Sequence, residues 1–536
     1  MKVRVIDLVI IAIYLIGITA MGIWMGRKNK SQDDYFLAGR KMGWFPIGLS
    51  ILATMVSANT FVGGPGWAYG EGLRSFMNNS NLPLVLFLVS GIFLPFLYNL
   101  KVTSIYEYVG KRFGKFSRLL TAIGFIIMAV LLVSTMIYTP ALFISEVAGW
   151  NIKIVLPVMI AIAIVYTLAG GIAAVIWTDA IQMIVLWGGM IAMFFIALRA
   201  TGMSFTEAMT TANAAGMLNA IDPSVNLALN NGLWVTLIGV GVHHLQYFSS
   251  DQSQVQRVLT AKNMKNVKRS YMLTGCLVNV EFFVFMLIGV LIFVVNNGRA
   301  YEMSNMVMID FVNNYVPVGV WGIVMAAVLA AVMSSVDSLL NSATTVFVKD
   351  IYNPFFSKEE KPDDAKGLRL ARIWTVVFAV GILLVSYFGL VGSTKSIIEM
   401  VASYTSYLCG SMFAVFFLAM FTEKSNDVGT AVGFICGCIA TGLVGKFTTV
   451  NWGWWNPLGF VVAAVIGYAV SRLTGGEKKE VKLLTYKGMR NSMIAEGRIQ
   501  EDGVYILPGK FEKSSYILLV LFVLQYVILF ALPHFF

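Results

Sequence analysis

The sequence predicts an all-α polytopic membrane protein with about fourteen transmembrane helices. Of its 536 residues, 58% are hydrophobic and 12% are charged, a composition too apolar for a soluble chain of this length. The apolar residues gather into runs of about 20, the length at which a helix crosses a bilayer. Most charged residues fall between these runs, so no soluble domain is left over.

Fourteen runs follow one another with mostly short connections. The first lacks a small-residue cleavage site, so we expect it to be retained and not removed as a signal peptide. The long polar connection 473–514 is expected to be partly disordered, because it is rich in charge and glycine. The predicted spans are 6–27, 46–73, 80–100, 117–148, 152–170, 172–199, 233–250, 270–296, 317–347, 370–391, 396–421, 428–446, 455–472 and 515–534.

The distribution of lysine and arginine predicts the orientation in the membrane. Of these 39 residues, 31 fall in alternate connections and 8 on the other side. Because positive residues collect on the cytoplasmic side, we expect a plasma membrane (cell inner membrane) protein with both termini outside the cytoplasm. The positive connections are 27–45, 101–118, 251–269, 347–372, 422–428 and 472–514.

Composition and motif spacing argue against several other classes of protein. The net charge of +11 is explained by topology and not by a nucleic-acid partner. The four cysteines and three histidines are not spaced as a zinc site or a catalytic triad. No nucleophile or paired acid and base indicates an enzyme. We therefore expect a transporter for a small solute and leave the oligomeric state open.

Two predicted spans combine polar residues with helix breakers. Span 46–73 contains Ser57-Ala58-Asn59-Thr60 and then Gly63-Gly64-Pro65-Gly66, and span 233–250 contains Gly239, Gly241, His243, His244 and Gln246. Non-helical backbone at membrane depth must line a cavity or be buried in protein. A pair of such spans in corresponding halves indicates a transporter's binding site. They are the first and sixth of ten helices, which predicts two inverted five-helix repeats.

A polar stripe runs along the predicted span 317–347. Ser334, Asp337, Ser338 and Ser342 recur at steps of three and four residues, so they share one face of a helix, with Ser335 beside them. Such a stripe either packs closely against a neighbouring helix or holds a cation.

Five passages, in this order, resemble the sodium/solute symporter family, which includes sodium/glucose cotransporters and a bacterial sodium/sialic acid symporter. They are Asp34–Arg40, Phe61–Gly66, Gly170–Gln182, Asp251–Arg257 and the serine run 330–342. The resemblance implies the LeuT fold, with one extra helix before the ten-helix core and three after it, and sodium-driven import by alternating access. It divides the chain into 1–45, the core 46–421 and the C-terminal part 422–536.

The resemblance also implies sodium ligands. The family's shared site falls on carbonyls of Ala53, Val56 and Ala331 and on hydroxyls of Ser334 and Ser335. Oxygens of this kind suit a small hard cation.

A second cation site is implied around Asp179, with Ser334, Asp337 and Ser338 as its other members. The family usually offers serine or threonine where this chain has Asp337. Two carboxylates at one ion raise its affinity, and their repulsion at an empty site favours protonation of one. We expect one or two Na⁺ ions, with H⁺ able to replace the second. In the alternative, Asp337 is simply solvated in a cytoplasmic vestibule.

The solute site is the least specific part of the resemblance. Aligned or neighbouring positions are Ser57, Thr60, Trp67, Tyr69, Asn79, His244 and Tyr247. The arginine that holds the carboxylate in the sialic acid symporter falls on Leu132. Aromatic faces with amide and hydroxyl rims suit a neutral polyhydroxylated ligand, so a sugar or sugar derivative is expected. The alternatives are an organic acid (sialic acid, a monocarboxylate or a vitamin) and a proton-coupled variant.

Overall fold

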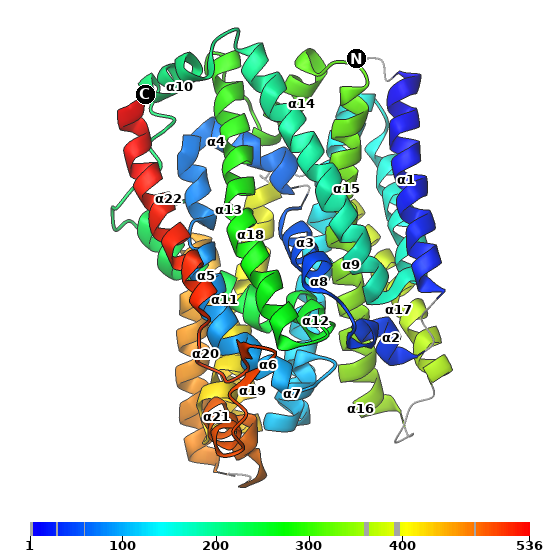
Figure 1. Cartoon of the computed structure of the whole chain (residues 1–536), viewed down its shortest axis with the longest axis vertical. Coiled ribbons are helices and arrows are strands. Elements are labelled where there is room, and N and C mark those ends of the chain that lie inside the picture. Colours follow the sequence, from blue (N-terminus) through cyan, green and yellow to red (C-terminus); the bar gives the residue numbers. More distant parts are fainter. Residues whose placement is uncertain (1–3, 28–30, 58, 358–363, 391–396, 476–478) are drawn as a thin grey trace.

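The computed structural model describes residues 4–27, 31–57, 59–357, 364–390, 397–475 and 479–536. These residues are almost entirely helical, which confirms the all-α prediction (Figure 1). Within them, the hairpin of β1 (Gln500–Glu501) and β2 (Val504–Tyr505) is the one sheet. The α-helices are α1 (Val5–Gly26), α2 (Gln32–Leu37), α3 (Trp44–Met55), α4 (Gly64–Glu71), α5 (Leu82–Leu88), α6 (Leu94–Asn99), α7 (Ile105–Arg112), α8 (Lys115–Ala148), α9 (Ile152–Ala200), α10 (Phe205–Ala214), α11 (Gly241–Ser250), α12 (Gln252–Leu259), α13 (Met264–Val295), α14 (Ser304–Tyr315), α15 (Val320–Val346), α16 (Asn353–Phe356), α17 (Asp364–Val385), α18 (Ile397–Phe421), α19 (Asp427–Phe447), α20 (Trp452–Thr474), α21 (Tyr486–Ala495) and α22 (Tyr516–Phe535).

Ten helices in the described ranges are long and apolar enough to cross a membrane, and three shorter apolar helices accompany them. The polytopic prediction is thus confirmed, whereas the count of fourteen is only partly reproduced. The predicted spans 152–170 and 172–199 are two helices on either side of a kink at Gly171 (φ 60°, ψ −178°), and together they make up α9. Only glycine adopts that backbone conformation without strain.

Helix α15 lies inside the helix bundle, beside α1 (Figure 1). It packs against α1, α3, α8, α9 and α17, and nearly all of its residues are buried. Buried on all sides in this way, a helix belongs to the core. The serine stripe therefore faces other helices and not lipid.

The first predicted interruption is confirmed. Helix α3 ends at Met55, and Val56 leaves the helical conformation (φ −91°, ψ 89°). The chain resumes in a π-helical turn at Asn59–Gly63 and continues as α4. Pro65 stands in the first turn of α4, where its missing N–H costs nothing.

The second interruption lies further along the chain than predicted. The residues Val235–Ser250 stay helical, first as a π-helical turn and then as α11, and the break comes at Asp251 (φ −95°, ψ 128°). Gly239 serves close packing instead, since a Cβ there would come within 2.6 Å of the Gly453 carbonyl oxygen. The Asp251 side chain accepts the backbone N–H of Ser253 and so begins α12.

The segment 251–269, predicted to be a cytoplasmic connection, contains the buried helix α12. Every residue of α12 is buried, and Arg257 is completely covered. Arg257, counted above among the cytoplasmic positive charges, therefore lies inside the protein.

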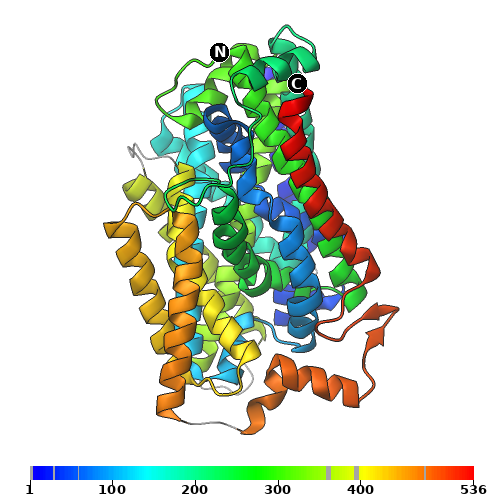
Figure 2. The same cartoon turned by 90° about the vertical axis from the view of Figure 1, so that its left-hand side faces the viewer.

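The chain ends and four helices of the predicted positive connections lie at opposite ends of the molecule, while which end faces the cytoplasm stays a prediction. The starts of α1 and the end of α22 lie at one end of the molecule, and α2, α7, α16 and α21 lie at the other (Figure 1). The polar segment, expected to be partly disordered, is folded where the structure describes it: α21 and the hairpin lie across that second end (Figure 2). They are held there by Tyr108 Oη, which donates to the Leu484 carbonyl, and by the Lys268–Glu512 ion pair at 2.9 Å.

Candidate functional site

The predicted shared sodium residues meet where α3 ends beside α15. The Ser334 hydroxyl donates to the Ala53 carbonyl oxygen at 3.1 Å, so the two helices touch at this point. Ser334 and Ser335 both also lie 3.2 Å from the Ala331 carbonyl oxygen. All five predicted residues, Val56 included, are buried.

The local backbone explains why a cation fits here. The last carbonyls of a helix lack intrahelical donors and carry the negative end of the helix dipole. Because α3 stops at Met55 inside the protein, these carbonyls stay away from water. Hydroxyls of α15 complete a set of oxygens that matches the preference of small hard cations.

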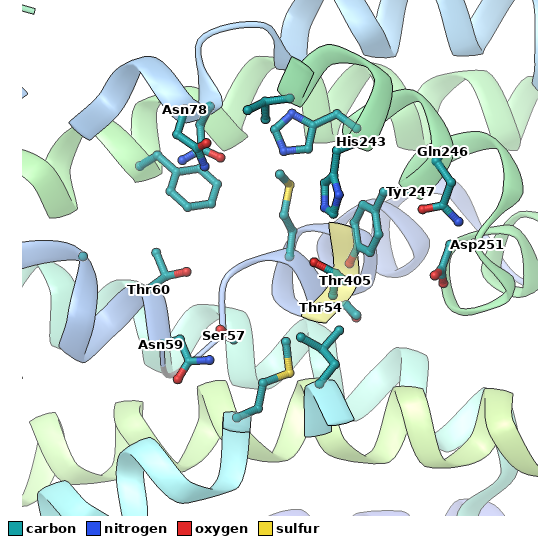
Figure 3. A pocket seen from close by; sticks show the side chains of 18 of the residues that line it. Thr54, Ser57, Asn59, Thr60, Asn78, His243, Gln246, Tyr247, Asp251 and Thr405 are labelled. Carbon is teal, nitrogen blue, oxygen red and sulfur yellow. The ribbon is translucent and has the colours of Figure 1, made fainter. Parts of the chain in front are cut away.

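A cavity of about 220 Å³ lies next to the break in α3. Ser57, Asn59 and Thr60 project from the α3–α4 side, and His243 and Tyr247 face them from α11 (Figure 3). In all, the wall includes four amides, two tryptophans and four methionines. None of its lining residues is a lysine or an arginine. The amides, tryptophans and methionines are Asn59, Asn78, Asn79 and Gln246; Trp67 and Trp452; and Met55, Met128, Met136 and Met286.

Six of the seven predicted solute residues line this cavity; Tyr69 does not. The Tyr69 hydroxyl instead donates to the Arg299 carbonyl oxygen at 2.6 Å. Leu132 is part of the wall, at the position where the resemblance aligns an arginine. The six residues in the wall are Ser57, Thr60, Trp67, Asn79, His244 and Tyr247.

Two of these side chains are already oriented by hydrogen bonds. His244 Nδ1 lies 2.6 Å from Asn81 Oδ1, which requires the proton on Nδ1 and leaves Nε2 as an acceptor in the neutral ring. Gln254 Nε2 donates to the Tyr247 hydroxyl at 2.6 Å. Preorganised polar groups of this kind reduce the entropy lost when a ligand binds.

The residues predicted to hold a second cation surround a different charge. Arg257 Nη2 lies 3.1 Å from Asp179 Oδ2, and both side chains are completely buried. Ser338 Oγ is 3.4 Å from the same carboxylate oxygen and also contacts the guanidinium. Ser334 is directed to Ala53 instead.

Asp337 is also fully buried. Its Oδ1 accepts the Ser338 hydroxyl at 3.3 Å. The alternative in which Asp337 is solvated in a vestibule is therefore wrong for this conformation.

Sequence reasoning missed the guanidinium and two of its partners. Ser50 Oγ accepts Arg257 Nε and lies 2.6 Å from Asp179 Oδ2, while Thr54 contacts Arg257 Nη2. The available indication was the run Gln252–Arg257, which is polar on every face yet contains only one charge after Asp251. Such a helix needs partners for each polar group when it is buried.

Comparisons with known proteins agree with this geometry. A family model described as "SSF: Sodium:solute symporter family" matches residues 35–437. Solute carrier family 5 member 4B of Mus musculus is 31% identical over 472 residues, which cover 81% of this chain and 71% of that protein. The sodium/glucose cotransporter of Vibrio parahaemolyticus is 28% identical over 455 residues, covering 80% of this chain and 83% of the relative.

A solved structure resembles most of the chain. It is a substrate-bound, outward-open Na⁺-coupled sialic acid symporter, with a TM-score of 0.80, 26% identity, and coverage of 89% of this chain and 99% of that one. This likeness confirms the LeuT fold. The chain belongs to the sodium:solute symporter family.

Proposed function

We propose that this protein is a sodium-coupled symporter of the plasma membrane that imports a neutral, polyhydroxylated solute, a sugar or sugar derivative, by alternating access. Na⁺ binds where α3 ends against α15, at Ala53, Val56, Ala331, Ser334 and Ser335. A second coupling cation binds near Asp179 and Asp337. Both termini lie outside the cytoplasm, as the lysine and arginine distribution predicts.

The observation that carries the choice of solute is the cavity wall beside the break in α3. It offers aromatic faces, amides, hydroxyls and two histidines, but none of its lining residues is a lysine or arginine. A buried carboxylate ligand normally needs a guanidinium or ammonium partner. Stacking on aromatic faces with amide and hydroxyl contacts at the rim suits a ring that carries hydroxyl groups.

The neighbouring Na⁺ site supports coupling. Ser57 and Thr60 line the cavity and stand only a few residues after Ala53 and Val56, in the same interrupted segment. Binding of Na⁺ fixes the end of α3 and therefore the backbone from which these hydroxyls project. A solute that binds the fixed arrangement better than the mobile one must in turn raise the affinity for Na⁺.

The test is uptake by the purified protein in liposomes. A panel of neutral sugars, sialic acid, short monocarboxylates and a vitamin acid is offered under an inward Na⁺ gradient and under an equal K⁺ gradient. We expect concentrative uptake of at least one neutral sugar with Na⁺ only. Uptake confined to the acids would overturn the assignment of the solute, and equal uptake with both gradients would overturn coupling to Na⁺.

Leu132→Arg sharpens the same experiment. Leu132 lies in the cavity wall, so an arginine there introduces the cation that the lining residues lack. We expect sialic acid to compete with the transported sugar about tenfold better than in the wild type, the effect of one charged hydrogen bond. Leu132→Met is the matched control, because it changes shape and not charge.

A further inference from the structure

The Asp179 carboxylate has two oxygens with very different surroundings. Oδ2 lies near Ser50, Ser338 and Arg257. Oδ1 is buried and accepts no hydrogen bond from the residues that the structure describes. The guanidinium therefore serves only one side of this carboxylate.

Two further buried side chains near Asp179 carry polar atoms with few partners. Gln182 follows Asp179 by three residues, so both lie on one face of α9. Gln182 is 1% exposed, yet neither its amide oxygen nor its amide nitrogen makes a hydrogen bond within the described parts of the chain. The Tyr14 hydroxyl on α1 is likewise covered, and the Gln182 amide is its polar neighbour.

These groups belong to one cluster. Tyr14 has Gln182 as its side-chain neighbour, with the carboxylates of Asp337 and Asp179 within electrostatic range. The cluster brings together α1, α9 and α15, which pack against one another in pairs. Asp179 Oδ1, the Gln182 amide and the Tyr14 hydroxyl have few hydrogen-bond partners for buried groups. This is unusual, because each buried group without a partner costs free energy.

The donor set indicates what is missing. A carboxylate oxygen, an amide carbonyl oxygen and a phenolic oxygen are all hard oxygens, and such groups bind small cations such as Na⁺. A carboxylate in the membrane interior calls for a positive charge nearby. The Arg257 guanidinium already lies against Asp179 Oδ2, together with the Ser50 and Ser338 hydroxyls. An exchangeable ion can therefore bind only at the other oxygen, Oδ1.

We propose that the second coupling cation is a Na⁺ ion bound on the α1 side of Asp179, by Asp179 Oδ1, the Gln182 carbonyl oxygen and the Tyr14 hydroxyl, with Arg257 held permanently on the other oxygen. The inference rests on sodium coupling as proposed above. In it, Gln182 and Tyr14 take the place of Ser334 and Ser338 as ligands of the second ion. It also gives α1, the helix that precedes the ten-helix core, a direct part in ion binding.

The experiment measures binding of ²²Na⁺ to the full chain in detergent, by equilibrium dialysis at fixed pH. Sodium is the only probe, so the solute need not be known. The variants are Tyr14→Phe, which removes one oxygen, and Gln182→Leu, which removes the amide. Gln182→Glu keeps an oxygen at the same place. Tyr108→Phe is the matched control, because its hydroxyl bonds a distant backbone carbonyl.

We expect two ions per wild-type chain and two for Tyr108→Phe and Gln182→Glu. Tyr14→Phe and Gln182→Leu should each lose the second ion or bind it about tenfold more weakly, as expected when one charged contact is lost. Two ions bound unchanged in both variants, or a single ion in the wild type, would overturn the inference. No ion at all in the wild type would instead overturn the proposed coupling to Na⁺. If Gln182→Leu does not fold, Tyr14→Phe decides alone.

Discussion

The two helix breaks of this protein differ in what becomes of their unpaired backbone groups. The break after α3 leaves carbonyl oxygens at a buried helix end, close to the Ser334 hydroxyl. The break before α12 is closed by its own residues, since Asp251 accepts the backbone N–H of Ser253. The first break leaves acceptor oxygens for the Na⁺ ion that we propose, whereas the second is followed by Arg257, whose positive charge is part of the protein.

That fixed charge joins four helices. Arg257 on α12 contacts Ser50 and Thr54 on α3, Asp179 on α9 and Ser338 on α15. The neighbouring Gln256 donates to the Phe36 carbonyl and to Asn341. The break after α3 is therefore suited to exchange of an ion. The break before α12 is suited to holding α3, α9 and α15 together through Arg257.

The largest effect is expected when Arg257 is removed. Arg257→Met leaves Asp179 and three hydroxyls buried without their cation, and breaking a buried ion pair in this way costs about 3–5 kcal/mol. We expect a marked loss of thermal stability in detergent. The double variant Arg257→Met with Asp179→Asn removes both charges and should regain much of the loss.

A double-mutant cycle makes this prediction quantitative. Asp179→Asn alone leaves the guanidinium unpaired and should also destabilise. If the two single effects simply add in the double variant, Arg257 and Asp179 do not act as a pair, and the fixed-charge description of the second break is incorrect.

The first break should respond to sodium and not mainly to heat. Ser334→Ala removes the hydroxyl that joins α15 to Ala53, and Ser335→Ala removes the neighbouring one. Each loses one ion contact, so we expect about a tenfold rise in the Na⁺ concentration that gives half-maximal uptake. Thr344→Val on the same helix is the control, because its hydroxyl lies 3.1 Å from the Thr375 hydroxyl on α17 and not beside α3. A similar rise in the control would assign the effect to helix packing.

The capping residue of the second break offers a smaller test. Asp251→Ala removes the cap of α12 and should cost about 1 kcal/mol of stability, while Asp251→Asn retains a capping oxygen and should cost little. Because Asp251 also lines the cavity, uptake separates the two roles. Loss of uptake in the stable Asp251→Asn variant would show that the charge itself contacts the ion or the solute.

The first break could be predicted from the sequence, whereas the position of the second could not. The polar run Ser57-Ala58-Asn59-Thr60 followed by Gly63-Gly64-Pro65-Gly66 predicted the first break. Its chemistry is local, because helix breakers follow polar residues within one segment. The second break was placed about ten residues too early, since Gly239 and Gly241 look like helix breakers although Gly239 allows close packing against Gly453. The sequence alone does not distinguish a glycine that breaks a helix from a glycine that allows close helix packing.

Arg257 shows the other limit. A count of positive residues treats every arginine between apolar spans as solvated, and only the fold brings Asp179, 78 residues away, against this one. The two carboxylates of the predicted second site were found from sequence. The pairing of Arg257 with Asp179 and the surroundings of the Gln182 amide could not be predicted, because they depend on how separate helices pack in three dimensions.

The smallest effect is expected at a cap outside the membrane, which serves as a reference for Asp251. Ser204 begins α10, and Glu207 accepts both its backbone N–H and its hydroxyl at 2.8 Å. These hydrogen bonds lower the pKa of Glu207 below its ordinary 4.5. A depressed pKa stabilises the folded helix above about pH 4.5, and the contribution disappears as the pH falls through the lower folded value. Hydrogen exchange of α10, corrected for intrinsic rates, should therefore rise at low pH in the wild type and show no such step in Glu207→Gln. Sodium-driven uptake at neutral pH should be the same in both, because this cap is exposed and carries no ion or solute contact, in contrast to the buried cap at Asp251.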